Sequence, residues 1–177
     1  MSPMFVPGPV DVAPEVAAAQ TLPMVPHRSK EFESIFRRSE ARARQLFYTQ
    51  YRVFISTSSG TGFHEAAVRN FVPDSGRLLM CSNGAFGNRW YDVAVSNGKT
   101  ADKLETPMGE PITAEKVAGA LEAAAHKGIH YDMFAIVHNE TSTGLMNPVK
   151  EIAAVVGELS PDTLICVDAV SSLTGAK

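Results

Sequence analysis

The sequence predicts an α/β fold with three layers, in which helices cover both faces of a mostly parallel central sheet. Short apolar segments typical of strands alternate with longer segments of helical periodicity, and the connections between them are short. Charged residues make up 20% and apolar residues 45% of the chain, which is ordinary for a globular protein. A chain of 177 residues is long enough for one domain with a sizeable core.

The first 27 residues are expected to form an extended arm. They contain six of the eleven prolines, which leaves room for at most a short helix around residues 15–20. Residues 28–177 are assigned to the sheet-containing domain. Its first helix starts at Ser29, because six apolar residues then share one helical face: Phe32, Ile35, Phe36, Ala43, Leu46 and Phe47.

Strands and helices alternate through the rest of the chain. The predicted strands are 52–57, 77–81, 100–105, 132–138 and 163–167. The predicted helices are 62–71, with Phe63, Ala66 and Ala67 facing inward; 87–97, closed by Gly98; 113–127, with Val117, Ala120, Leu121 and Ala124 inward and Gly128 as its stop; and one capped by Asn147 and begun by Pro148, with Val149, Ile152, Ala153 and Val156 inward.

Charge and hydropathy argue against several classes of protein. The net charge is −3, which does not suggest binding to nucleic acid or to a membrane surface. No apolar run approaches the roughly 18 residues of a membrane span, and the N-terminus does not resemble a secretory signal. We therefore expect a cytoplasmic protein, in which Cys81 and Cys166 are buried free thiols.

Residues 58–62, Ser-Ser-Gly-Thr-Gly, lie between a predicted strand and a predicted helix. Glycines let the backbone approach a ligand, and a helix N-terminus offers free N–H groups with a partial positive charge. The segment therefore has the outline of a phosphate cradle. It is neither a Walker A loop nor the dinucleotide-binding fingerprint, because the lysine and the glycine spacing are absent. A tight turn without a ligand explains it about equally well.

Two further polar segments follow predicted strands. In residues 83–89, Phe86 stands between two glycines, so it is either a platform for a flat ring or a core residue in a flexible turn. Residues 138–144, from His138 to Gly144, offer several hydrogen-bonding groups. A capped loop without a ligand explains the second segment about as well, with His138 as a partly buried, satisfied histidine.

Asp168 is a carboxylate at the end of the last predicted strand. Alone, such a residue more often caps a turn than binds a cofactor. Together with the three segments above, however, it would meet them at the carboxyl edge of one sheet, where ligands of α/β proteins bind. A flat, phosphorylated heterocycle that can be protonated fits all four sites. Pyridoxal 5′-phosphate has these properties, and its ring nitrogen needs a carboxylate to hold its proton.

The chain resembles the class V (fold type I) pyridoxal-phosphate aminotransferases, closest to the alanine–glyoxylate and serine–pyruvate branch. The resemblance spans nearly the whole chain, and the motifs keep their order and spacing. These motifs are Pro7-Gly8-Pro9-Val10, His27-Arg28-Ser29, Gly60-Thr61-Gly62 with Glu65-Ala66, Asn83-Gly84-Ala85-Phe86-Gly87, Asn139-Glu140-Thr141-Ser142-Thr143-Gly144 and Val167-Asp168-Ala169-Val170-Ser171-Ser172.

The resemblance implies a role for each matching position. Thr61 and Gly62 would bind the cofactor phosphate, with Phe63 adjoining them. Phe86 would stack on the pyridine ring, Thr141 would hydrogen-bond the ring hydroxyl, and Asp168 would hold the ring nitrogen as the catalytic carboxylate. The family also implies a homodimer, no metal, and as substrates a small amino acid (serine or alanine) and a 2-oxo acid (glyoxylate or pyruvate).

The resemblance also implies that part of the enzyme lies elsewhere. In the family, the Schiff-base lysine follows the aspartate motif at some distance, whereas here only Lys177 follows Asp168. We therefore expect this chain to be the N-terminal part of an aminotransferase, without the rest of the large domain or the small domain, and inactive alone. The alternatives are a related cysteine desulfurase, which usually carries His where Phe86 stands, and a non-catalytic module that binds the cofactor or a partner.

Overall fold

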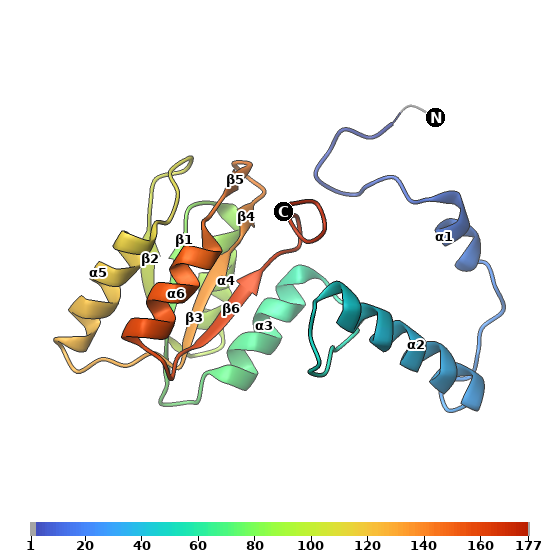
Figure 1. Ribbon diagram of the computed structural model, residues 1–177, viewed down its shortest axis with the longest axis horizontal. Coiled ribbons are helices and arrows are strands. Elements are labelled where there is room, and N and C mark those ends of the chain that lie inside the picture. Colours follow the sequence, from blue (N-terminus) through green and yellow to red (C-terminus); the bar gives the residue numbers. More distant parts are fainter. Residues whose placement is uncertain (1–2, 177) are drawn as a thin grey trace. The chain divides into compact units, whose positions relative to one another are not determined.

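The computed structural model describes residues 3–176 and divides the chain into two compact units, Met1–Thr57 and Ser58–Lys177 (Figure 1). The first unit contains helices α1 (Pro14–Ala19) and α2 (Lys30–Leu46). Both were predicted. Ser29 caps α2, because its side-chain oxygen accepts the backbone N–H of Phe32 at 3.1 Å.

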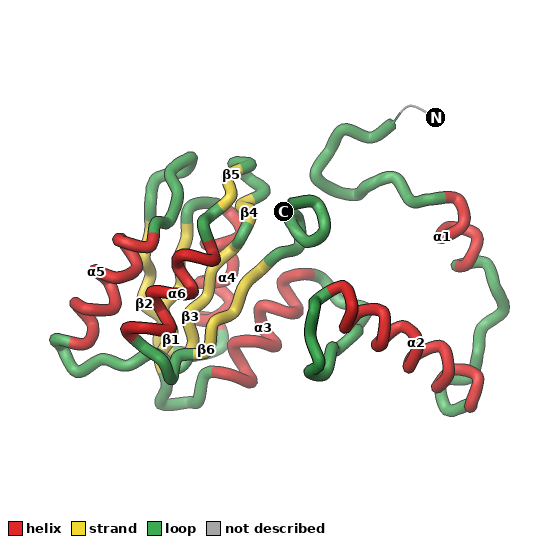
Figure 2. The backbone as a smooth tube through the Cα atoms, in the orientation of Figure 1, coloured by secondary structure: helices red, strands yellow, loops and turns green. Residues whose placement is uncertain are grey.

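The predicted strand at 52–57 is wrong. This segment is irregular, and Figure 2 draws it as a loop. Its apolar side chains are largely exposed, with Phe54 at 77%. Strand propensity alone does not make a strand, because the backbone must also find a neighbouring strand to pair with.

The second unit is built around a parallel sheet, as the sequence predicts, and its four strands lie in the order β2-β1-β3-β6. Its strands are β1 (Arg77–Ser82), β2 (Thr100–Glu105), β3 (Met133–Val137) and β6 (Leu164–Asp168), and its helices are α3 (Gly60–Phe71), α4 (Ala85–Ser96), α5 (Ala114–Ala125) and α6 (Val149–Leu159). A short antiparallel pair, β4 (Asn139–Glu140) with β5 (Leu145–Met146), was not predicted.

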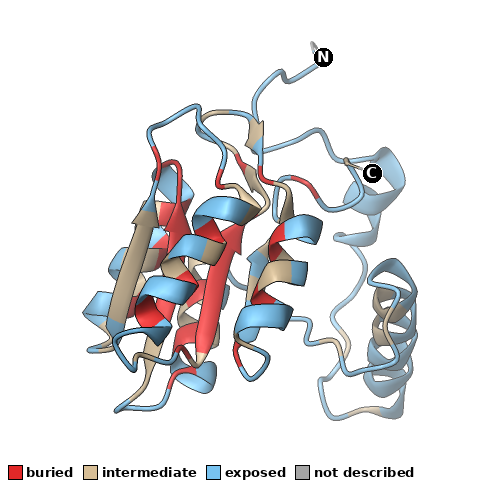
Figure 3. Cartoon of the chain, turned by 60° about the vertical axis from the view of Figure 1, so that its left-hand side comes forward, coloured by how far each residue is buried: buried red, intermediate tan, exposed pale blue. Residues whose placement is uncertain are grey.

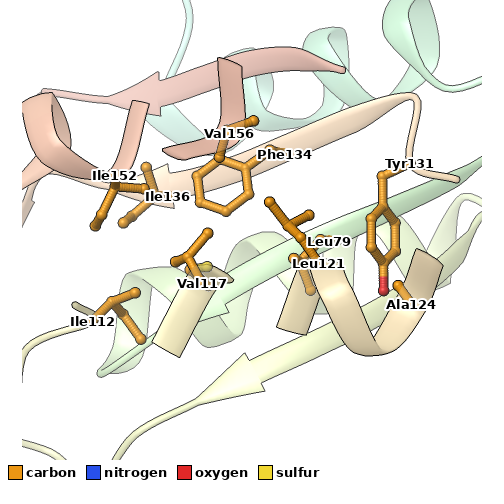
Figure 4. Packing of buried hydrophobic residues seen from close by; sticks show 11 residues of the cluster. Leu79, Ile112, Val117, Leu121, Ala124, Tyr131, Phe134, Ile136, Ile152 and Val156 are labelled. Carbon is orange, nitrogen blue, oxygen red and sulfur yellow. The ribbon is translucent and has the colours of Figure 1, made fainter. Parts of the chain in front are cut away.

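Alternation of side chains along β1 and β3 produces the three layers. Leu79, Cys81, Phe134 and Ile136 pack under α5 and α6 (Figure 4), whereas Leu78, Met80, Met133 and Ala135 pack under α3 and α4. Both strands are buried almost along their whole length, as expected for a parallel sheet with two covered faces (Figure 3). Gly98 and Gly128, which follow α4 and α5, have φ of +72° and +68°, as their predicted helix-ending roles require.

Two local predictions are wrong. In α3 the buried residues are His64 and Val68, whereas Phe63 and Ala66 are exposed, so the buried face is rotated from the predicted one. Asn147 does not cap α6, whose N-cap is Pro148. Its amide instead donates to the carbonyl of Val137 at 2.8 Å and accepts the N–H of Ile112 at 2.9 Å, because these buried backbone groups need partners.

Both cysteines are free, as predicted, but only Cys81 is fully buried. Burial raises the pKa of the Cys81 thiol strongly, and it raises the pKa of the half-buried Cys166 to about 11. Both sulfurs are therefore weak nucleophiles at neutral pH. Across residues 3–176, the helices are too short or too polar to cross a bilayer.

Candidate functional site

Asp168 lies at the carboxyl end of β6, and its side chain is only 8% exposed. One carboxylate oxygen, Oδ1, accepts the backbone N–H of Val170 at 2.9 Å, and Oδ2 lies 2.7 Å from Nε2 of His64. Burial by itself raises the pKa of Asp168, but the hydrogen bonds from His64 and Val170 and the charge interaction with His64 outweigh burial, so the pKa lies below its ordinary value. Asp168 is therefore ionised at neutral pH.

His64 is the site residue that the sequence did not reveal. It extends from α3, and its ring stacks on Trp90 of α4 with 4.3 Å between the ring centroids and 6° between the planes. His64 shares one face of α3 with Val68, four residues away, and this spacing is the signal that could have identified it. Of the predicted inward positions, Phe63 and Ala66 are exposed, whereas Ala67 is half-buried and packs against the core.

The segment 58–62 forms the N-terminus of α3. Ser59 caps the helix by accepting the N–H of Gly62 at 3.2 Å, while the N–H groups of Gly60 and Thr61 have no acceptor within residues 3–176. Two backbone donors with partial positive charge are thus free for an anion. A Cβ added to Gly60 would lie 3.5 Å from Cγ2 of Val170, so this loop adjoins the segment that follows Asp168.

The loop at 58–62 does not follow a strand, contrary to the sequence prediction. Three of the four predicted site segments do follow strands, namely those after β1, β3 and β6. Residues 58–62 follow an irregular connection instead. Their position depends on the packing of α3 rather than on a strand end.

Glu140 joins two of the predicted site segments. Its carboxylate is fully buried and accepts the backbone N–H groups of Phe86 at 3.1 Å, Gly87 at 3.2 Å and Ser142 at 3.1 Å, and the Ser142 hydroxyl at 2.6 Å. Two of these donors belong to the first turn of α4, where a negative charge is favourable. Gly84 is required beside it, because an added Cβ would overlap Cγ of Glu140.

Thr141 is tied to the segment that follows Asp168. Its hydroxyl donates to Oγ of Ser171 at 2.7 Å, and Nδ2 of Asn139 donates to the same oxygen at 2.9 Å. Ser171 in turn donates to the carbonyl oxygen of Asn139 at 3.1 Å. The hydroxyl oxygen of Thr141 therefore remains near the carboxyl end of β6, with its own proton already engaged.

The structure thus connects the predicted site segments through intermediate residues. Thr61 and Gly62 lie in the first turn of α3, and Phe86, which is 38% exposed, lies in the first turn of α4. Phe63 is exposed on α3. The ligand-binding roles of Thr61, Gly62, Phe63, Phe86, Thr141 and Asp168 stay predictions, and Lys177 lies outside the described residues.

Comparisons with known proteins agree with this arrangement. The chain is 32% identical over 173 residues to the L-aspartate–glyoxylate aminotransferase of Paracoccus denitrificans, covering 97% of this chain and 43% of that protein. It is 30% identical over 171 residues to the serine–glyoxylate aminotransferase of Methylorubrum extorquens, covering 96% and 42%. The crystal structure of an alanine–glyoxylate aminotransferase from Nostoc superposes with a TM-score of 0.86 at 30% identity, covering 95% and 43%.

The chain therefore spans less than half the length of these relatives, and its fold is that of the fold type I pyridoxal-phosphate enzymes. The family model described as aminotransferase class-V matches residues 15–177. The order of the predicted motifs, the parallel sheet and this match agree, and the chain belongs to the class-V aminotransferases.

Proposed function

We propose that the whole protein is an aminotransferase that uses pyridoxal 5′-phosphate and moves an amino group from a small amino acid, such as serine or alanine, to a 2-oxo acid such as glyoxylate or pyruvate. The observation that carries the proposal is Asp168. It is a buried, ionised carboxylate at a strand end, and among residues 3–176 a single donor occupies each of its oxygens. Lone pairs on both oxygens remain for a further donor.

The residues of the site fit four chemical features of the cofactor. The free N–H groups of Gly60 and Thr61 suit its phosphate, with the Thr61 hydroxyl and Gly62 beside them. Asp168 suits the protonated ring nitrogen, because a buried carboxylate pairs best with a cation. The partly exposed ring of Phe86 suits the flat face of the heterocycle, and Thr141 suits the ring hydroxyl as an acceptor.

Each residue would have a separate task in the reaction. When bound, the cofactor supplies a conjugated ring that withdraws electrons from the substrate carbon. Asp168 would keep the proton on the ring nitrogen, which strengthens that withdrawal. The first turn of α3 would fix the phosphate, and Phe86 would exclude water from one face of the ring.

The names of the relatives favour some of the candidate substrates over others. All three contain glyoxylate, whereas the amino donor is aspartate, serine or alanine. Glyoxylate is therefore the favoured acceptor. These names also favour amino transfer over cysteine desulfuration. The homodimer and the cytoplasmic location stay predictions from the family resemblance and from composition.

The test uses the whole protein reconstituted with pyridoxal 5′-phosphate. Amino transfer from serine, alanine and aspartate to glyoxylate is measured for the wild type and for Asp168→Ala. We expect Asp168→Ala to lose about a thousandfold in turnover while remaining folded, because the ring nitrogen would lose its counter-ion. Asp162→Ala, at an exposed turn before β6, is the matched control. Near-normal activity of Asp168→Ala would contradict the proposed role.

A further inference from the structure

His64 is held between two partners that come from different parts of the fold. Trp90 of α4 stacks on one face of the His64 ring, and Oδ2 of Asp168 in β6 lies within hydrogen-bond distance of Nε2. Its side chain is only 6% exposed. A polar ring this deeply buried needs partners for its nitrogens, and Asp168 is the partner of Nε2.

The short contact shows where a proton lies. Two lone pairs cannot approach within 2.7 Å, so a hydrogen stands between Nε2 of His64 and Oδ2 of Asp168. A carboxyl group is ordinarily a stronger acid than an imidazolium, so this hydrogen belongs to His64, which acts as the donor. The other ring nitrogen, Nδ1, is buried and has no partner within the part of the chain that the structure describes. A proton on Nε2 satisfies the contact with Asp168.

Two anchors fix the orientation of the carboxylate. The N–H of Val170 holds Oδ1, and His64 holds Oδ2. With both oxygens engaged, the group cannot rotate without losing a hydrogen bond, so the directions of its remaining lone pairs are fixed. Trp90 fixes the plane of His64 in turn. Trp90 stands four residues after Phe86, so one helix carries both aromatic residues on neighbouring turns of the same side.

We propose that His64 is a positioning residue for Asp168, and that its Nε2–H holds the carboxylate so that a free lone pair meets the protonated ring nitrogen of the cofactor. This inference rests on the proposed function. It gives the stack of His64 on Trp90 a role beyond packing. The stack fixes the imidazole ring, and the ring orients the carboxylate of Asp168 that would bind the ring nitrogen.

Two variants separate the hydrogen bond from the packing. His64→Phe keeps a flat ring against Trp90 but has no donor, whereas His64→Gln keeps an N–H donor but loses the stack. The whole protein without cofactor is titrated with pyridoxal 5′-phosphate and with its 1-deaza analogue, in which a carbon replaces the ring nitrogen. The ratio of the two dissociation constants reports the contact between Asp168 and the ring nitrogen alone.

We expect the wild type to prefer pyridoxal 5′-phosphate, and His64→Phe to reduce that preference about tenfold, as loss of a hydrogen bond to a charged group does. His64→Gln should retain most of the preference. A purely structural role predicts the reverse: His64→Phe would keep the preference, and the inference would be wrong. If the wild type binds neither compound, the proposed function fails as well, so the two failures are distinguishable.

A measurement on the wild type alone covers the case in which the variants do not fold. With histidines labelled by ¹⁵N, the ring resonances of His64 are observed by NMR. We expect a proton bound to Nε2, and we expect its resonance to move when pyridoxal 5′-phosphate binds but much less when the 1-deaza analogue binds. A bare Nε2, or equal shifts with the two compounds, would overturn the inference.

Discussion

Glu140 follows the carboxyl end of β3, and Asp168 ends the neighbouring strand β6; both side chains are buried carboxylates, yet their surroundings differ. Glu140 accepts three backbone N–H groups and one hydroxyl, from the first turn of α4 and from Ser142. Asp168 accepts one N–H and one imidazole. A carboxylate whose lone pairs are all used holds the protein together, whereas one with spare lone pairs can bind something else. The number of donors thus distinguishes Glu140, which anchors the structure, from Asp168, which has lone pairs left for a further donor.

The largest effect on stability is expected from Glu140→Gln. The amide places an NH₂ group where backbone N–H groups now donate, so at least one buried donor loses its acceptor. We expect a loss of about 2–3 kcal/mol in the free energy of unfolding, measured by chemical denaturation. The control is Glu122→Gln on the exposed side of α5. Equal stability of the two variants would show that Glu140 is not a structural anchor.

Gly84→Ala tests the same anchor from the backbone side. The new methyl group would overlap Glu140 and force the loop before α4 to move. We expect about 1–3 kcal/mol of destabilisation. Gly119→Ala, in the middle of α5 with no neighbour within 4 Å of the new atom, should instead stabilise by up to about 1 kcal/mol. Thermal unfolding of both variants measures this difference in sign. If Gly84→Ala left the stability unchanged, the loop before α4 would be able to move away from Glu140 without cost.

The smallest effect on stability is expected from Asp168→Asn, about 1 kcal/mol or less at neutral pH, because few donors depend on Asp168. Its signature is the dependence on pH. The pKa of Asp168 is lowered on folding, so its ionised form stabilises the protein above the ordinary pKa of about 3.9, and this contribution is lost as the pH falls through the lower folded value. The wild type should therefore lose more stability than Asp168→Asn between neutral pH and about pH 3. Parallel denaturation curves at both pH values measure this, and identical losses would contradict it.

Much of the second unit could be predicted from the sequence because local pattern and tertiary packing agree there. The strand at 133–137 is an uninterrupted apolar run, and Gly128 ends a helix that has a clear apolar face. The strand predicted at 52–57 has a short apolar run, but no strand within residues 3–176 pairs with it, and a single sequence does not reveal pairing.

The segments of the candidate site could be located from the sequence, but the contacts among them could not. Asp168 stands out in the sequence because a carboxylate ends an apolar strand. His64, 104 positions away, stands out only when the fold brings α3 against the end of β6. Glu140 was part of a recognised motif, but its role depends on the first turn of α4, which approaches it only in the folded chain. Contacts between residues distant in sequence carry this information, and local patterns do not.

Asn147 has a chemical consequence of its own. Its amide joins Val137, Ile112 and Asn83, so it ties together the connections that follow β1, β2 and β3. Spontaneous deamidation of asparagine requires attack by the backbone nitrogen of the next residue, and here that residue is Pro148, which has no N–H. Asn147 is therefore protected against slow deamidation to a carboxylate. Its hydrogen bonds to the connections around the site should persist over time.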